Sequence, residues 1–521
     1  MTAKKGSGRT VFLMMAATVL AKALGVARQM LIASHYGAGC AADAFNAAQA
    51  LPLTMFDILL GAAIPGAFIP AYNRMMAKDG ESRADLFADR FLNAVFVFTG
   101  LLALLGIVFA PQLTELAASE LDAGTKALSV RLLRIMFPMI IFTGGAYTLT
   151  GVMQSKGRFM LPALISSVSN GVMIVWLAVF NDRFGDAAVY GLAAASVLSW
   201  LAQLLTLAVP LASHGDRRFS IRPSAGLRDP ELLPTLRSAP QVMIGAWLTP
   251  MMLLIGTRFS VIAAGDGGIT VFGNAYHTYI LITGILTYSV CNYFFPELSR
   301  LSASDPEGEF ISELRKGLGS ALMISLPFTA AVWLLSPQGI SILYLHGEFT
   351  AENAAGAAMA LRSLSLSIPA FTVVEVLSRA FYARRLGRIP MTAALVGVAA
   401  DLIVTAALVL PGFMSGVAAV AAGGAAAQIA AALTLLTAAA RHMKGLFSGF
   451  IRRMLPAIIG AVLSAALMAA VYELVPSSPY DDGALRNILF CAAVAVPGAA
   501  VYLAAVAADL MHRRKERKQG E

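Results

Sequence analysis

Residues 21–52 read AKALGVARQMLIASHYGAGCAADAFNAAQALP, two apolar segments joined by the small turn Tyr36–Gly39. A helix that crosses a bilayer needs about 20 mainly apolar residues, and both segments extend far enough to reach that length. Lys22, Arg28 and Asp43 nevertheless lie within or at the edges of these segments. Charged side chains in membrane helices usually face a bundle interior or a wet cavity, because lipid exposure is costly. This stretch therefore predicts membrane helices that enclose a charged interior.

The whole chain has the composition of a polytopic membrane protein. Its 521 residues are 58% hydrophobic and 13% charged, and the mean hydropathy is +0.72, far from ordinary soluble domains. The longest polar connections, near 213–235 and 300–316, leave no room for a soluble catalytic domain. We predict an all-α protein with about 14 spans, near residues 10–35, 41–72, 90–110, 128–153, 159–181, 187–211, 238–264, 270–298, 317–336, 356–383, 390–411, 415–440, 453–475 and 485–511.

The basic residues predict how the chain is oriented. On this span pattern, nearly all Lys and Arg residues outside the spans fall in alternate connections, as cytoplasmic loops do. Both termini are then cytoplasmic, including the basic tail 512–521. The net charge of +9 is mostly this orientation signal and predicts no nucleic-acid partner. The cysteines, Cys40, Cys291 and Cys491, have no metal-type spacing, so neither a disulfide framework nor a metal site is indicated.

Cations outnumber anions within the predicted spans. Because buried charges need compensation, the surplus predicts an interior suited to an anion. The seven cations are Lys22, Arg28, Arg131, Arg134, Arg258, Arg362 and Arg379, and the four acids are Asp43, Asp57, Glu375 and Asp401. For Arg131 and Arg134, snorkelling to the outer face is the alternative, and for Arg379 a local pair with Glu375 one turn earlier.

Three pairs of motifs indicate an internal duplication. FIPAYNRM (Phe68–Met75), RLLRIMFP (Arg131–Pro138) and GRFMLP (Gly157–Pro162) correspond, at a near-constant offset, to FFPELSRL, RSLSLSIP and GRIP. The offset spans six helices, so the copies have the same orientation, as in two-lobed transporters with a substrate site near the midplane. We predict an N-lobe at 1–212, a cytoplasmic loop at 213–235, a C-lobe at 236–441, two further helices at 442–511 and the tail.

The motifs in and beyond the first two spans resemble those of the MurJ/MviN family, the lipid II flippases of the MOP exporter superfamily. The matching elements are LG-x-x-R (Leu24–Arg28), YGAG (Tyr36–Gly39), ADAF (Ala42–Phe45), LLRIMFP (Leu132–Pro138) and LYLHGEFTAENA (Leu343–Ala354). The resemblance implies a bacterial cytoplasmic-membrane protein, expected to be monomeric. Its substrate would be an undecaprenyl-diphosphate-linked disaccharide pentapeptide, moved from the inner to the outer leaflet. The two C-terminal helices would form a groove for the polyprenyl tail, or simply pack closely through their small residues.

The resemblance also suggests substrate-binding residues. Lys22 and Arg28 stand where the family pattern places two cavity arginines, and Asp43 matches an acidic position that either gates or caps its helix. The pattern is broken at Phe56 and Gly61, where the family has an arginine and a glutamate; Asp57 lies beside the first. The family's third cavity arginine aligns with His277, which is either cationic or a neutral wall residue.

The remaining interior charges are assigned by hypothesis. We expect Arg258, Arg362 and Arg379 to supply the missing positive charge for the substrate. Asp57, Glu375 and Asp401 are candidates for gating or ion coupling, and a structural hydrogen bond is an equal alternative for Asp401. No cofactor is expected; a monovalent cation or the membrane potential would reset the cycle.

Three other functions compete with lipid II transport. A flippase for another polyprenyl-linked oligosaccharide, such as an exopolysaccharide or O-antigen unit, fits the same pattern. A drug or cation antiporter is disfavoured because a cationic substrate needs interior carboxylates. A membrane-embedded enzyme is disfavoured because the six His residues form no HExxH or acidic-pair motif.

Overall fold

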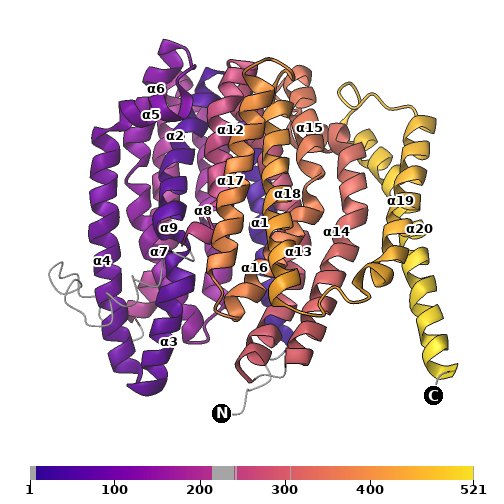
Figure 1. The fold of residues 1–521 in the computed structure, drawn as a ribbon. Helices are drawn as coiled ribbons and strands as arrows, with labels where there is room; N and C mark the ends of the chain where they lie inside the picture. Colours follow the sequence, from indigo (N-terminus) through magenta and orange to yellow (C-terminus); the bar gives the residue numbers. More distant parts are fainter. Residues whose placement is uncertain (1–7, 214–239, 241–242, 305–306, 520–521) are drawn as a thin grey trace. The chain divides into compact units, whose positions relative to one another are not determined.

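The computed structural model describes residues 8–213, 240, 243–304 and 307–519, and every regular element in them is a helix (Figure 1). The predicted all-α fold is confirmed. The first elements are α1 (Gly8–Tyr36), α2 (Cys40–Phe56), η1 (Asp57–Gly61), η2 (Ile64–Phe68), α3 (Ile69–Lys78), α4 (Glu81–Val108), α5 (Ala110–Ala118), α6 (Ala123–Met136), α7 (Met139–Ser155), α8 (Met160–Val175), η3 (Trp176–Phe180), η4 (Asn181–Arg183), η5 (Gly185–Ala187) and α9 (Ala188–Ser213). The others are α12 (Leu248–Ala264), α13 (Gly268–Ser304), α14 (Glu307–Tyr344), α15 (Ala351–Ser365), α16 (Ile368–Ala383), α17 (Arg388–Val409), α18 (Val417–His442), α19 (Phe450–Leu474) and α20 (Ala484–Gln519).

The helices match the predicted spans in position. Among the described residues, 10 helices are long and apolar enough to cross a membrane, or up to 12 if each bent pair is one span. Helix α1 and the shorter apolar helix α12 stand at the other two predicted positions. The predicted cytoplasmic loop at 213–235 lies almost entirely outside the described residues.

Two spans break at equivalent places in the repeated motifs. Helices α6 and α7 meet at 43° beside Pro138, and α15 and α16 meet at 50° just before Pro369. A proline ring clashes with the preceding turn and donates no hydrogen bond, so it interrupts a helix. The two motifs, RLLRIMFP and RSLSLSIP, therefore each mark the point at which a membrane span bends.

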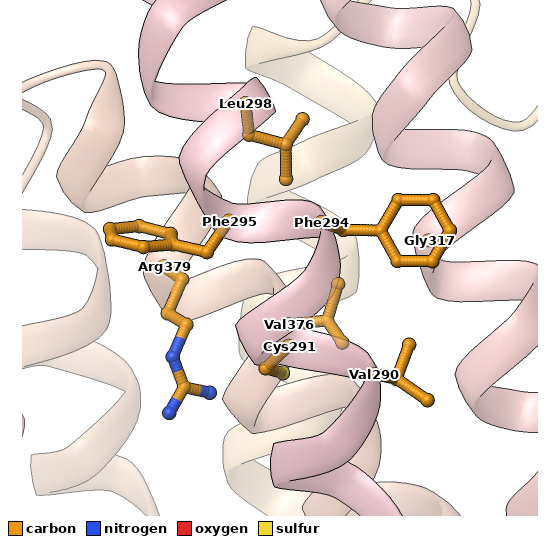
Figure 2. A pocket seen from close by; sticks show the side chains of 8 residues that line it. All are labelled: Val290, Cys291, Phe294, Phe295, Leu298, Gly317, Val376 and Arg379. Carbon is orange, nitrogen blue, oxygen red and sulfur yellow. The ribbon is translucent and has the colours of Figure 1, made fainter. Parts of the chain in front are cut away.

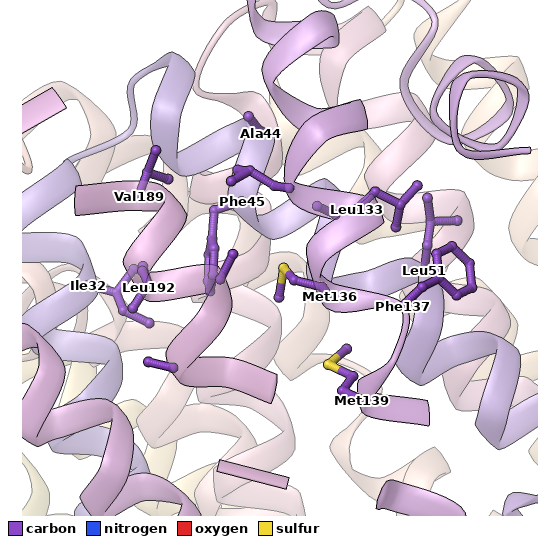
Figure 3. Packing of buried hydrophobic residues seen from close by; sticks show 14 of the residues in the cluster. Ile32, Ala44, Phe45, Leu51, Leu133, Met136, Phe137, Met139, Val189 and Leu192 are labelled. Carbon is purple, nitrogen blue, oxygen red and sulfur yellow. The ribbon is translucent and has the colours of Figure 1, made fainter. Parts of the chain in front are cut away.

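The chain packs as two compact units. The first comprises Met1–Val261, Gly265–Thr270 and His346–Glu348. Its core gathers side chains from α2, α6 and α9, including Phe45, Leu133, Met136 and Leu192, all at most 1% exposed (Figure 3).

The second unit comprises Ile262–Ala264, Val271–Leu345 and Phe349–Glu521. Within it, α19 packs along α20 through small residues. A Cβ atom on Gly460 would lie 2.9 Å from the Ala505 Cβ, and one on Gly498 would lie 2.4 Å from Met468. These two glycines therefore allow close helix packing.

Candidate functional site

Helix α1 carries the two cations for which the resemblance was most specific. Lys22 and Arg28 are both half-buried and lie six residues apart, roughly 9 Å along the helix axis. The helix packs mainly against α8, where the Asn170 side chain donates to the Ala21 carbonyl oxygen at 3.1 Å. This bond holds α1 in place next to Lys22, so the first unit presents two cations on one fixed helix.

Asp43 binds the start of another helix instead of capping its own. Its carboxylate accepts hydrogen bonds from the Gly267 backbone N–H (2.7 Å), the Thr270 N–H (2.8 Å) and the Thr270 hydroxyl (2.6 Å). Asn46 donates to that hydroxyl at 3.0 Å, and Asp43 is fully buried. The carboxylate therefore satisfies free N–H groups at the start of α13. Gly267 and Thr270 belong to the same unit as Asp43, whereas α13 from Val271 onward belongs to the second unit.

Gly267 and Gly347 permit close contacts at the end of the first unit that carries the α1–α2 turn. Gly267 has a φ of +86°, and a Cβ there would lie 2.4 Å from the Ala38 carbonyl oxygen. Gly347, in the HGEFT segment, has a φ of +58° and would clash similarly with Ser34. The Glu348 N–H donates to the Ser34 carbonyl oxygen at 3.0 Å. Only glycine fits both positions, because each combines left-handed backbone with no room for a side chain.

The second span changes from α-helix to π-helix in its middle. Two π-helical segments, η1 and η2, separate α2 from α3, and Pro65 lies in the second. The indole of Trp247 donates to the Ile58 carbonyl oxygen at 3.0 Å. π-Helical turns leave backbone groups in need of partners and are frequent at functional sites. This irregular region contains Asp57 and Gly61, where the chain departs from the family pattern.

The structure shows what surrounds Phe56 and Gly61, the two positions at which the chain departs from the family pattern. Phe56 is 1% exposed and packs on Tyr147 with ring centroids 5.3 Å apart, so it offers no phosphate contact. A Cβ on Gly61 would lie 2.9 Å from the Asp57 carboxylate. The Asp57 carboxylate therefore occupies the space beside Gly61, which lies four residues, about one helical turn, further along the chain.

Three predicted cations have protein partners. Arg258 donates to the Ser119 hydroxyl and, at 3.3 Å, to the Glu115 carbonyl oxygen, which ties α12 to the end of α5. Arg362 donates to the Trp333 carbonyl oxygen at 3.0 Å and lies 5.5 Å from the indole centroid. Arg379 pairs with Glu375 at 2.6 Å, the local ion pair named as its alternative.

The last two predicted residues differ in environment. His277 is exposed, although its neighbours Tyr276 and Thr278 are buried. Asp401 is 2% exposed and accepts from the Thr405 hydroxyl at 3.1 Å, while its Oδ2 has no partner among the described residues. Asp401 therefore retains an open oxygen, and its assignment as an ion ligand stays a prediction.

Arg379 borders a small apolar pocket of the second unit (Figure 2). Phe294 points from α13 toward Gly317 of α14, and the other lining side chains are Val290, Cys291, Phe295, Leu298 and Val376. A free volume of about 10 Å³ holds at most one water molecule. This pocket is far too small for a glycan headgroup.

Some contacts had no signal in the sequence. Cys40, Asp122 and Asp266 come from three separate segments, yet their donor atoms lie within 4.8 Å of one another on an exposed surface. Tyr147 of α7 stacks with Trp200 of α9 at 6.3 Å. Aromatic residues at helical spacing usually indicate a packed core. The sequence therefore gave no reason to assign Tyr147 or Trp200 to a site.

The sequence profile described as lipid II flippase MurJ matches residues 32–490. The chain belongs to the lipid II flippase MurJ family. The expectation of a transporter instead of an enzyme is thereby confirmed. The probable lipid II flippase MurJ of Rhizobium tropici is 30% identical over 397 residues, covering 74% of this chain and 72% of that protein.

Solved structures share the MurJ-family fold. A lipid II flippase MurJ in an inward closed conformation superposes with a TM-score of 0.77 at 20% identity, covering 96% of this chain and 99% of that one. A multidrug resistance MATE family transporter of the MOP superfamily, in an inward-facing conformation, gives 0.67 at 16% identity, covering 84% and 98%. At these identities the likeness concerns the fold alone.

Proposed function

We propose that this protein moves lipid II, an undecaprenyl-diphosphate-linked peptidoglycan precursor, from the inner to the outer leaflet of the bacterial cytoplasmic membrane. The observation that carries the proposal is the match of the MurJ family profile to residues 32–490. It acts as a monomer, with both termini in the cytoplasm.

The charges of the first unit support this substrate. A diphosphate inside a membrane needs positive charge to replace its hydration. Lys22 and Arg28 supply it from one helix, Arg28 with a planar fork and Lys22 as a point charge. In the second unit, His277 and Arg362 are further candidates, since His277 is exposed and Arg362 is half-buried.

Alternating access requires contacts that close one side and then part. The hydrogen bonds of Asp43 to Gly267 and Thr270, and of Glu348 to Ser34, are suited to this role because they join separate segments at one end of the first unit. We propose that these bonds break when the transporter opens outward. A monovalent cation, with Asp401 as a candidate ligand, or the membrane potential drives the return.

Complementation tests the proposal. A bacterium depleted of its own lipid II flippase should be rescued by the wild-type chain, but not by Lys22→Ala or Arg28→Ala at matched expression. Lys22→Arg should rescue because it keeps the charge. Lys316→Ala is the matched control: its side chain is 64% exposed and forms a surface ion pair with Glu313 one turn away, so rescue should persist.

Failure of a correctly inserted wild-type chain would count against lipid II as the cargo. Transport of another polyprenyl-linked glycan would then be measured in the same membranes. Rescue by both alanine variants would instead remove Lys22 and Arg28 from the binding site.

A further inference from the structure

Asp57 is an acidic residue without a counter-charge in the middle of a membrane span. It lies in the Cys40–Lys78 span and is exposed. Among the residues that the structure describes, no side chain forms a hydrogen bond or an ion pair with its carboxylate. Carboxylates in membrane segments ordinarily pair with a cation or mark a functional site. Among the described residues, the Asp57 carboxylate is therefore open to a ligand.

The carboxylate is held where a ligand can reach it. Asp57 begins the π-helical segment η1, and its side chain folds over Gly61, whose missing Cβ leaves the space it occupies. Pro65, two turns from Asp57, is also exposed. The Asp57–Pro65 face of the second span is thus open, and glycine is required at 61 for the carboxylate to lie there.

Aromatic rings stand beside this carboxylate. Tyr147 is 39% exposed, contacts Phe56 and lies within electrostatic range of Asp57. Trp200 stacks on Tyr147 with an interplanar angle of 29° and a centroid distance of 6.3 Å, which fixes the orientation of the Tyr147 ring. The face of an aromatic ring is negative and attracts cations. A carboxylate and an aromatic face together favour a cation and repel a phosphate.

We propose that Asp57 and Tyr147 bind an ammonium group on the peptide portion of the cargo. This inference rests on the proposed function, because it assigns a second contact to the same lipid-linked substrate. Lys22 and Arg28 then bind the diphosphate and Asp57 binds the opposite charge, so the first unit orients a cargo that carries both signs. A sugar hydroxyl would satisfy the hydrogen bond but would leave the negative charge uncompensated.

Binding of two cargo forms to the full-length protein in lipid nanodiscs tests the proposal. One form is lipid II with a free peptide ammonium, and the other is the same molecule with that nitrogen acetylated. The wild type should bind the free form about tenfold more tightly, the size expected for a charged contact beside an aromatic ring. Asp57→Asn should lose most of this preference, because only the aromatic contact with Tyr147 then still favours the ammonium.

Two further variants test whether the position of the Asp57 carboxylate and the neighbouring aromatic ring contribute to the preference for the ammonium form. Gly61→Ala keeps the Asp57 charge but displaces it, so it should also lose most of the tenfold preference. Tyr147→Leu should lose part of it. Gly100→Ala is the control, because a Cβ there has nothing within 4 Å, and it should bind both forms as the wild type does.

A wild type without preference, or an Asp57→Asn protein that keeps the preference, would overturn the ammonium contact. An inorganic cation as the occupant would appear as equal binding of both cargo forms, with a sodium or potassium dependence that Asp57→Asn abolishes. This outcome also overturns the proposal. If neither lipid II form nor undecaprenyl diphosphate bound to the wild type, the proposed function itself would fail, which is a distinguishable result.

Discussion

At the scale of single residues, charges inside this protein either form ion pairs within it or remain open. Lys156 illustrates the first kind: its side chain is 7% exposed and bonds Glu81 at 2.7 Å and Asp85 at 2.9 Å. Tyr72 also donates to Asp85, at 2.7 Å, so the cluster joins α3, α4 and the end of α7. Asp57 is the second kind, and the difference separates structural charges from candidate binding groups.

Lys156→Met should destabilise the protein because it removes the buried ammonium that pairs with both Glu81 and the half-buried Asp85. We expect a loss of about 1–3 kcal/mol, seen as a lower Tm of the purified protein. Lys316→Met, at an exposed ion pair, should change the Tm little. Equal Tm values for the two variants would contradict the structural role of Lys156.

The pH dependence of this loss follows from the Lys156 pKa. Burial alone would lower that pKa, but the hydrogen bonds and charges of Glu81 and Asp85 outweigh burial and raise it. A raised pKa stabilises the fold fully below the unfolded lysine value of about 10.4 and loses that contribution as pH rises through the folded value. The Tm difference between wild type and Lys156→Met should therefore stay constant from about pH 6 to 9.

At the scale of elements, glycines and prolines decide where helices approach or break. Phe137 lies at the α6–α7 break and is fully buried. A Cβ on Gly106 of α4 would stand 2.1 Å from its ring. The bent span therefore inserts an aromatic ring directly against the backbone of α4, and no larger residue fits at 106.

Gly106→Ala and Gly100→Ala, both on α4, should differ sharply. The first overpacks the Phe137 contact and should cost about 1–3 kcal/mol, while the second meets nothing within 4 Å and should be neutral. Thermal unfolding of both purified variants measures this. A neutral Gly106→Ala protein would mean that α4 does not contact the α6–α7 break as described.

At the scale of the whole molecule, the distribution of basic residues predicts the orientation of the chain in the membrane. Cys40 and Ser478 lie in connections predicted to be outside, and Ser448 lies in one predicted to be cytoplasmic. All three are exposed. The native thiol of Cys40 can therefore report the orientation of the chain directly.

Thiol labelling should test this orientation. In intact spheroplasts, a membrane-impermeant maleimide should label wild-type Cys40. In a Cys40→Ser background, Ser478→Cys should react from outside and Ser448→Cys only after permeabilisation. The Cys40→Ser protein measures any background from Cys291 and Cys491. The reverse pattern would place the termini outside.

Much of the fold was predictable because membrane helices obey local rules. Apolar length located the spans, and the repeated motifs indicated the duplication. The equivalent breaks beside Pro138 and Pro369 appeared only in the structure. The candidate site was less predictable. Asp43 was named as a gate or a cap, yet its partners, Gly267 and Thr270, are more than two hundred positions away in the sequence.

The sequence by itself determined the membrane class, the positions of the spans and the family, because apolar length, charge and short motifs are properties of contiguous residues. Only the tertiary structure decided which interior charges are satisfied. Arg379 is paired locally and Arg258 across helices, while Asp57 folds over Gly61 beside Tyr147 without a partner among the described residues. The physical reason is that charge compensation depends on distances of a few ångströms between segments remote in the chain, and no local pattern encodes those distances.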